Sequence, residues 1–156
     1  MHTNLRAKAR LPKRQGFTLI ELLVVIAIIG VLSTLAVVSL NNAREKSRDA
    51  KRVSDIKQVQ TALELYFTDK DSYPAGTDLV LGGDTALALS SGNGFAATTG
   101  GTAFMEQVPS NPTPGGADYL YTQTLSGVSY TLTFTLEGQT GALLLGGHTA
   151  SPSGIE

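Results

Sequence analysis

The feature that most constrains this chain is an uninterrupted run of uncharged residues at positions 22–40. Within this run only Ser33, Thr34 and Ser39 are polar, and Gly30 is the single glycine. About 20 such residues are enough to cross the hydrocarbon core of a bilayer as a helix. A buried helix of a soluble protein has a similar composition, but here it would use up most of the core of a 156-residue chain. The run therefore predicts a membrane-spanning helix.

The helical pattern continues beyond the apolar run. Residues 41–70 contain neither proline nor glycine. Their apolar residues recur at spacings of three and four and so share one face of a helix: Val53, Ile56, Val59, Leu63, Tyr66 and Phe67. We expect one helix over residues 17–69, roughly 80 Å long and stopped by Pro74 after Tyr73.

The C-terminal half differs in composition and in the spacing of its apolar residues. Glycines punctuate residues 75–116, which predicts loops with a short helix at 84–90 and a turn at 103–107. From Asp118 the apolar period changes to two, and the pattern predicts a β-hairpin that turns at Ser126-Gly127.

Leu132, Phe134 and Leu136 share one face of the second strand of this hairpin. Residues 142–145 are a candidate third strand, and the tail from Gly146 reads as coil. The expected fold class is α+β: a lollipop in which one long N-terminal helix packs, through its 53–67 face, on a small antiparallel sheet.

Charge and chemistry exclude several classes of protein. Residues 1–16 carry five basic groups and no acid, whereas no Lys or Arg follows Lys70. The acidic C-terminal half is a poor nucleic-acid ligand. The absence of cysteine excludes disulfides and thiolate sites. Beyond the leader, His148 is the only histidine and no nucleophile–base set appears, so we expect neither an enzyme nor a cofactor.

Other polar groups have an ordinary and a functional interpretation. The basic residues Arg44, Lys46, Arg48, Lys51 and Arg52 could bind DNA or lipid headgroups. Because Glu45, Asp49 and Asp55 are interleaved with them, we favour a solvated helix surface with acidic partners in neighbouring subunits. Asp69, Asp71 and Asp78 could hold calcium, but acids are common at helix ends and turns. We therefore predict no metal site, and a solvated His148.

Glu21 is the exceptional residue, because it places a carboxylate beside the apolar run. At mid-bilayer such a group costs about 2.5–3.5 kcal/mol, and less nearer the interface. It could snorkel to the headgroups. Alternatively, a cut between Gly16 and Phe17 would create an α-amine four residues earlier, and this amine could meet Glu21 of a neighbouring copy. Breaking one partner of such a buried pair costs several kcal/mol, so the pair would set the stagger between subunits.

The stretch Lys13-Arg14-Gln15-Gly16-Phe17-Thr18-Leu19-Ile20-Glu21, with the apolar residues through Gly30, closely resembles the N-terminal motif of type IV prepilins and pseudopilins. The resemblance implies that a prepilin peptidase cuts after Gly16 and methylates Phe17. It also implies that Thr18 and Glu21 act in subunit assembly. Gly30 would allow close helix packing, or is simply tolerated.

The sequence departs from this family in two places. Val38 stands where many members have a helix-kinking proline. The C-terminal acids are also too sparse to support the calcium site of secretion-type major pseudopilins.

The combined expectation is a structural subunit of a type IV pilus or a type II secretion pseudopilus, closest in style to major pseudopilins of type II secretion and short bacterial pilins. Its parts would be a removed leader (1–16), a transmembrane and filament-core half-helix (17–40), an amphipathic half-helix (41–73), and a variable loop region with the sheet (74–156).

Expected partners are further copies of the chain, a prepilin peptidase, other pilins, an assembly platform and the membrane, with no nucleic acid. The chain would cross the cytoplasmic membrane once with its N-terminus inside, and then enter a periplasmic or extracellular filament. A signal-anchored protein that never polymerises and a minor pilin for DNA uptake or adhesion remain alternatives.

Overall fold

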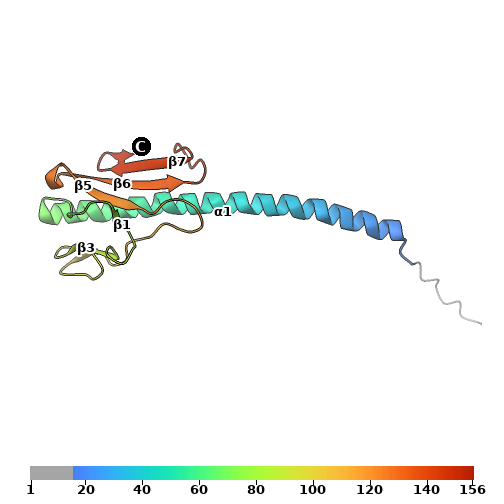
Figure 1. Ribbon diagram of the computed structural model, residues 1–156, viewed down its shortest axis with the longest axis horizontal. Coiled ribbons are helices and arrows are strands. Elements are labelled where there is room, and N and C mark those ends of the chain that lie inside the picture. The colour runs from blue at the N-terminus through green and yellow to red at the C-terminus, as the bar shows by residue number, and fades with distance from the viewer. Residues whose placement is uncertain (1–15) are drawn as a thin grey trace, which may run out of the picture. The chain divides into compact units, whose positions relative to one another are not determined.

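The computed structural model describes residues 16–156, so the predicted leader lies outside the described residues except for Gly16. The chain forms two compact units, which meet between Leu40 and Asn41. One helix, α1 (Leu19–Lys70), runs through this boundary (Figure 1). It is the only regular element in the described part of the first unit, and it is the first element of the second unit. The predicted long helix is confirmed, and it ends one residue later than expected. Asp71 then adopts a left-handed conformation (φ 54°), which terminates the helix before Pro74 is reached.

The second half of α1 buries one face, as the spacing of its apolar residues predicts. Burial begins only at Asp49 and recurs every three or four residues, which is the repeat of a single helical face. The buried side chains on this face are Asp49, Arg52, Asp55, Ile56, Val59, Ala62 and Leu63.

A five-stranded antiparallel sheet lies against this half of the helix in the order β1-β5-β6-β7-β8 (Figure 1). Its strands are β1 (Leu79–Val80), β5 (Leu120–Thr124), β6 (Ser129–Leu136), β7 (Gly146–Ser151) and β8 (Gly154–Ile155). The hairpin β5–β6 is confirmed, with Tyr121 opposite Leu132. Its turn is a 3-10 segment (Leu125–Gly127) in which Leu125 and Ser126 both have positive φ. Val128 lies in this connection and is 66% exposed, so the second strand starts one residue later than expected.

The core lies between α1 and this sheet. Ile56, Val59 and Leu63 of the helix belong to the same buried cluster as Leu132 and Leu136 of β6. Each of these five side chains is fully shielded from solvent. Burial of apolar surface stabilises a fold by about 25 cal/mol per Å², so this contact stabilises the second unit. The expected α+β architecture, a helix packed on an antiparallel sheet, is confirmed.

The variable region folds differently from the prediction. The segment expected to be a short helix at 84–90 contains strand β2 (Ala88–Ser90), and the turn expected at 103–107 is strand β4 (Ala103–Met105). Together with β3 (Gly94–Ala96) they form a second antiparallel sheet, β3-β2-β4. Pairing on both sides of β2 supplies hydrogen bonds that local helix propensity could not outweigh.

The C-terminal prediction is also wrong. Residues 142–145 form a tight connection, closed by a bridge between Thr140 and Leu143, and the strand β7 begins at Gly146 where coil was expected. Of the β7 side chains only Ala150 is buried, so the sequence lacks the alternation of apolar and polar residues that predicts a strand. The strand forms because β6 offers an unpaired edge, along which Leu132 pairs with Ala150 and Leu136 with Gly146.

Candidate assembly site

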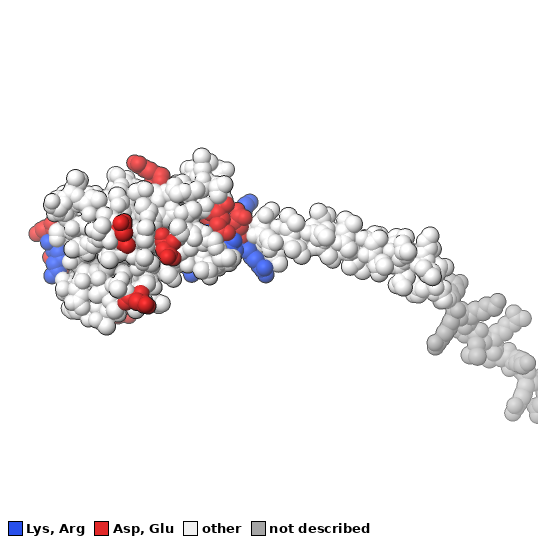
Figure 2. Space-filling model, viewed as in Figure 1, with Lys and Arg blue, Asp and Glu red and all other residues white. Residues whose placement is uncertain are grey.

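The described part of the first unit is an apolar helix with nothing packed on it. Its large hydrophobic side chains, from Phe17 to Leu40, are between 47% and 91% exposed. This stretch of α1 is long and apolar enough to span a membrane, and Figure 2 shows its visible surface without charge. A contiguous apolar surface of this extent requires lipid or other protein chains to cover it.

The four sequence-predicted residues at the start of the helix lie close together. Phe17 and Glu21 line one shallow apolar hollow together with Ile20, Val24 and Val25. Gly16 and Thr18 are their chain neighbours. Gly30 lies nine residues further along, where a Cβ atom would meet nothing within 4 Å. The structure therefore leaves room for a second helix at Gly30.

Glu21 is already hydrogen-bonded within its own helix. The backbone N–H and the hydroxyl of Thr18 each donate to Glu21 Oε2 at 2.7 Å, and the backbone N–H of Glu21 donates to the Thr18 hydroxyl at 3.3 Å. This reciprocal pattern is a capping box, which satisfies two of the otherwise free N–H groups at a helix N-terminus. The Thr-x-x-Glu spacing is a signal of this motif in the sequence, in addition to the resemblance that indicated Thr18.

A second polar site, the Arg52 cluster, lies in the second unit and joins α1 to two distant loops. The guanidinium of Arg52 is fully buried and donates to Asp49 Oδ1 and Glu137 Oε1, both at 2.6 Å. It also donates to the Asn111 side chain at 2.7 Å and to the carbonyl oxygens of Pro112 and Gly115 at 2.9 and 2.7 Å.

Further contacts close this cluster. Asp49, which is 1% exposed, accepts hydrogen bonds from the backbone N–H groups of Glu137 and Gly138 at 3.0 and 2.8 Å. Arg48 forms a two-point pair with Glu137. The hydrogen bonds from Arg48, with a smaller contribution from Arg52, lower the pKa of the Glu137 carboxyl to about 2, although burial opposes them.

The interpretation of the basic residues is therefore wrong for Arg48 and Arg52. They are not a solvated surface awaiting acids of other subunits, because their acids come from their own chain. The sequence could not reveal this, since Glu137 lies 85 residues beyond Arg52. Arg44, Lys46 and Lys51 are exposed, as expected.

The remaining candidates do not assemble into a site. Asp69 pairs with Lys70 at 3.3 Å, and Asp78 accepts a hydrogen bond from the Thr122 hydroxyl at 3.1 Å. Among residues 16–156, no group of three or more His, Asp or Glu side chains is placed to hold a metal ion. His148 is not a solvated tail residue: it lies on β7, half-buried, and its ring nitrogens contact the carbonyl oxygens of Leu144 and Glu156 at 2.7 and 3.1 Å.

Comparison with known proteins identifies the family. A family model for the prokaryotic N-terminal methylation motif matches residues 11–37. The type II secretion system core protein G of Escherichia coli (strain K12) is 36% identical over 111 residues, which are 69% of this chain and 71% of that protein. This chain belongs to the family of type II secretion core protein G.

Other relatives agree with this assignment. Core protein G of Vibrio cholerae serotype O1 is 33% identical over 112 residues, covering 72% of this chain and 73% of that one. The type IV major pilin protein PilA of Myxococcus xanthus is 37% identical over a shorter stretch, 40% of this chain and 28% of that protein. No solved structure matches the chain. The expected resemblance to pilins and pseudopilins is confirmed, and the chain is a structural pseudopilin subunit rather than an enzyme.

Proposed function

We propose that residues 1–16 are removed between Gly16 and Phe17, that Phe17 is methylated, and that the mature chain polymerises into a type II secretion pseudopilus through residues 17–40. The match of the methylation motif to residues 11–37 supports cleavage at this position. Residues 41–73 and 74–156 would form the outer, folded part of each subunit.

One observation carries the proposal: the apolar half of α1 is uncovered along its whole length, with every large hydrophobic side chain at least 47% exposed. In the membrane, lipid covers this surface. In a filament, other copies of the same helix cover it. Since lipid tails are as apolar as leucine, the exchange gains stability from close packing and polar contacts rather than from hydrophobic burial itself. The open surface at Gly30 permits such packing.

Glu21 supplies the polar contact. The capping box holds its carboxylate toward the start of the helix, where cleavage frees the amine of Phe17. In a filament core of low dielectric constant, a neighbour's amine would pair with this carboxylate and set the stagger of the subunits. Thr18 keeps the carboxylate hydrogen-bonded until that partner arrives.

The location and partners follow from this mechanism. The basic leader, with five Lys or Arg residues, would hold the N-terminus in the cytoplasm while α1 crosses the cytoplasmic membrane once. The partners would be a prepilin peptidase, copies of the chain, other pseudopilins and the secretion assembly platform. No nucleic acid partner is proposed. The filament would extend into the periplasm or beyond the cell.

Mass spectrometry of the chain isolated from cells tests cleavage, because it should find methylated Phe17 at the N-terminus. Glu21→Gln and Glu21→Ala variants should insert in the membrane but form no filaments. Glu106→Gln is the matched control, since Glu106 is an exposed carboxylate of the second unit and its loss should leave assembly unchanged. Normal filaments from both Glu21 variants would disprove the pairing. A chain that keeps its leader and stays solitary would disprove polymerisation and favour a simple membrane anchor.

A further inference from the structure

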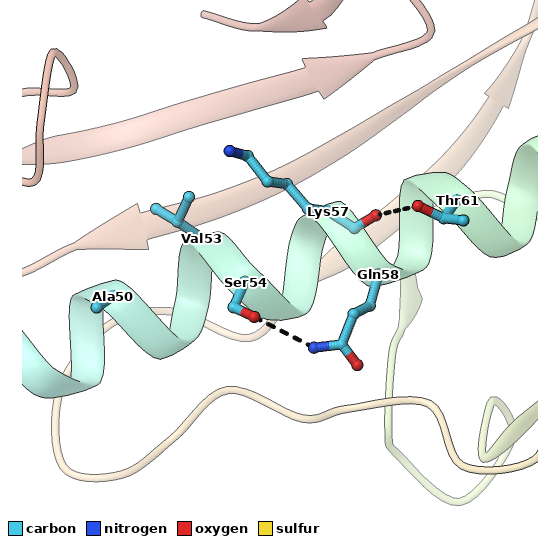
Figure 3. A pocket seen from close by; sticks show the side chains of 6 residues that line it. All are labelled: Ala50, Val53, Ser54, Lys57, Gln58 and Thr61. Carbon is cyan, nitrogen blue, oxygen red and sulfur yellow. Dashed lines mark hydrogen bonds between the residues drawn. The ribbon is translucent and has the colours of Figure 1, made fainter.

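The outward face of α1 in the second unit carries a row of small side chains, which we name the small-residue lane: Ala43, Ser47, Ala50, Ser54 and Thr61. All of them are exposed. Around Ala50, Ser54 and Thr61 the surface is hollowed (Figure 3). Two polar groups of the lane already have partners within the helix, because Gln58 donates to Ser54 at 3.3 Å and Thr61 donates to the Lys57 carbonyl at 2.9 Å. A partner can cover the lane without breaking these two hydrogen bonds.

Exposed cations border this lane. Arg44, Lys46, Lys51 and Lys57 are exposed, and none of them forms an ion pair within the described chain. The neighbouring Arg48 and Arg52, in contrast, are both engaged by Glu137. The hollow is lined by Ala50, Ser54 and Thr61 of the lane together with Val53, Lys57 and Gln58. Exposed cations lie in and beside it, so a partner with a negatively charged surface would complement it.

This chain itself carries such a surface. Residues 58–156 hold nine carboxylates against the single ammonium group of Lys70, a formal charge of −8. Figure 2 shows acidic side chains spread over one face of this region.

Three of these acids lie near the edge strand β1. Asp78 precedes this strand in the chain and Asp84 follows it. Asp118 is the chain neighbour of Tyr119, whose carbonyl oxygen accepts a hydrogen bond at 2.9 Å from the N–H of Leu81, the residue that follows β1. All three are exposed, and the structure of residues 16–156 gives none of them an ion pair. Strand β1 between Asp78 and Asp84 also carries Val80, an apolar side chain that is 39% exposed.

We propose that the small-residue lane of one copy docks on the acidic edge (Asp78, Val80, Asp84 and Asp118) of a neighbouring copy, an inference that rests on the proposed polymerisation. Val80 would fill the hollow at Ala50 and Ser54, and Lys51 and Lys57 would face the aspartates. The two surfaces are different patches of one chain, so the contact is head-to-tail. A repeated head-to-tail contact that does not close on itself generates a helical filament, which is the assembly expected here.

A lipid surface is the competing partner for the cations. Helices that lie in a membrane interface combine basic residues with large apolar side chains that insert between the headgroups. The lane offers alanine, serine and threonine instead, which cannot insert. Its composition therefore favours a protein partner.

Charge exchange in the full-length chain tests the docking. The double variants K51E/K57E and D78K/D84K should each reduce filament yield at least about tenfold, because like charges would face one another. The quadruple variant, in which the same charges are exchanged within one chain, should recover most of the yield. Lys70→Glu and Glu106→Lys change single charges outside both surfaces and should assemble normally.

Three outcomes would count against the docking. Normal filaments from either double variant would overturn the docking while leaving polymerisation intact. A quadruple variant that keeps native tyrosine near-UV circular dichroism but does not assemble would also overturn it, and would point to lipid headgroups as the partner. If the double variants lose that native signal, K51Q/K57Q replaces them, and an unchanged yield from this milder pair would count against the proposal. If the unmodified chain forms no filaments, or if the Glu21 variants form them equally well, the proposed function itself is refuted.

Discussion

Replacing Arg52 by methionine removes the guanidinium of the Arg52 cluster while keeping a side chain of similar length. The guanidinium donates to five acceptors between 2.6 and 2.9 Å, and two of them are carboxylates. The variant leaves Asp49, which is 1% exposed, without its counter-ion. Removal of one partner from a buried ion pair costs about 3–5 kcal/mol. Typical domains are stable by only about 5–15 kcal/mol, so the loss would be a large share of the free energy of unfolding.

Urea unfolding of the full-length chain in detergent measures this cost. Near-UV circular dichroism reports on the fold, because Tyr73, Tyr119, Tyr121 and Tyr130 are buried in the core. Arg48→Met is the matched control: its side chain is 21% exposed and, among the described residues, it pairs with Glu137 alone, so the loss should be smaller than that of Arg52→Met.

A double-mutant cycle separates the ion pair from general packing. The variant R52M/D49N should be more stable than the sum of its single changes predicts, because it leaves no unpaired charge in the core. A cost below about 1 kcal/mol for Arg52→Met, or strict additivity in the cycle, would refute the view that the cluster is a buried charge network.

Two further predictions concern the same loops. The pKa of Glu137 is lowered to about 2 from 4.5, so its ion pairs stabilise the fold above about pH 4.5 and lose that contribution as the pH falls toward 2. The urea midpoints measured at pH 5 and pH 2.5 should therefore differ less in Glu137→Gln than in the unmodified chain. An equal difference in both would contradict this assignment. Gly116→Ala should lower the free energy of unfolding by about 1–3 kcal/mol, because φ is +71° and the new Cβ would lie 3.0 Å from the Arg52 guanidinium. Gly147→Ala is the control: its Cβ would meet nothing within 4 Å, so the same urea titration should show no change.

The sequence alone determined the parts of this protein that depend on local pattern. The uncharged run at 22–40, the carboxylate of Glu21 and the 3.6-residue repeat beyond residue 50 predicted α1 and its buried face. The alternation around Leu132 predicted the β5–β6 hairpin, because its inward side chains lie on one chain segment and carry their own period. The N-terminal motif likewise indicated the family, since it occupies consecutive residues.

Only the tertiary structure decided where long-range pairing overrides local preference. Strand β7 has one buried side chain and exists because β6 offers hydrogen-bonding partners, and the sheet around β2 formed where a helix was expected. Arg52 and Glu137 are 85 residues apart, and no spacing rule connects them. Their partnership arises because folding buries the charge of Arg52 completely, and a buried charge without a partner would be too costly.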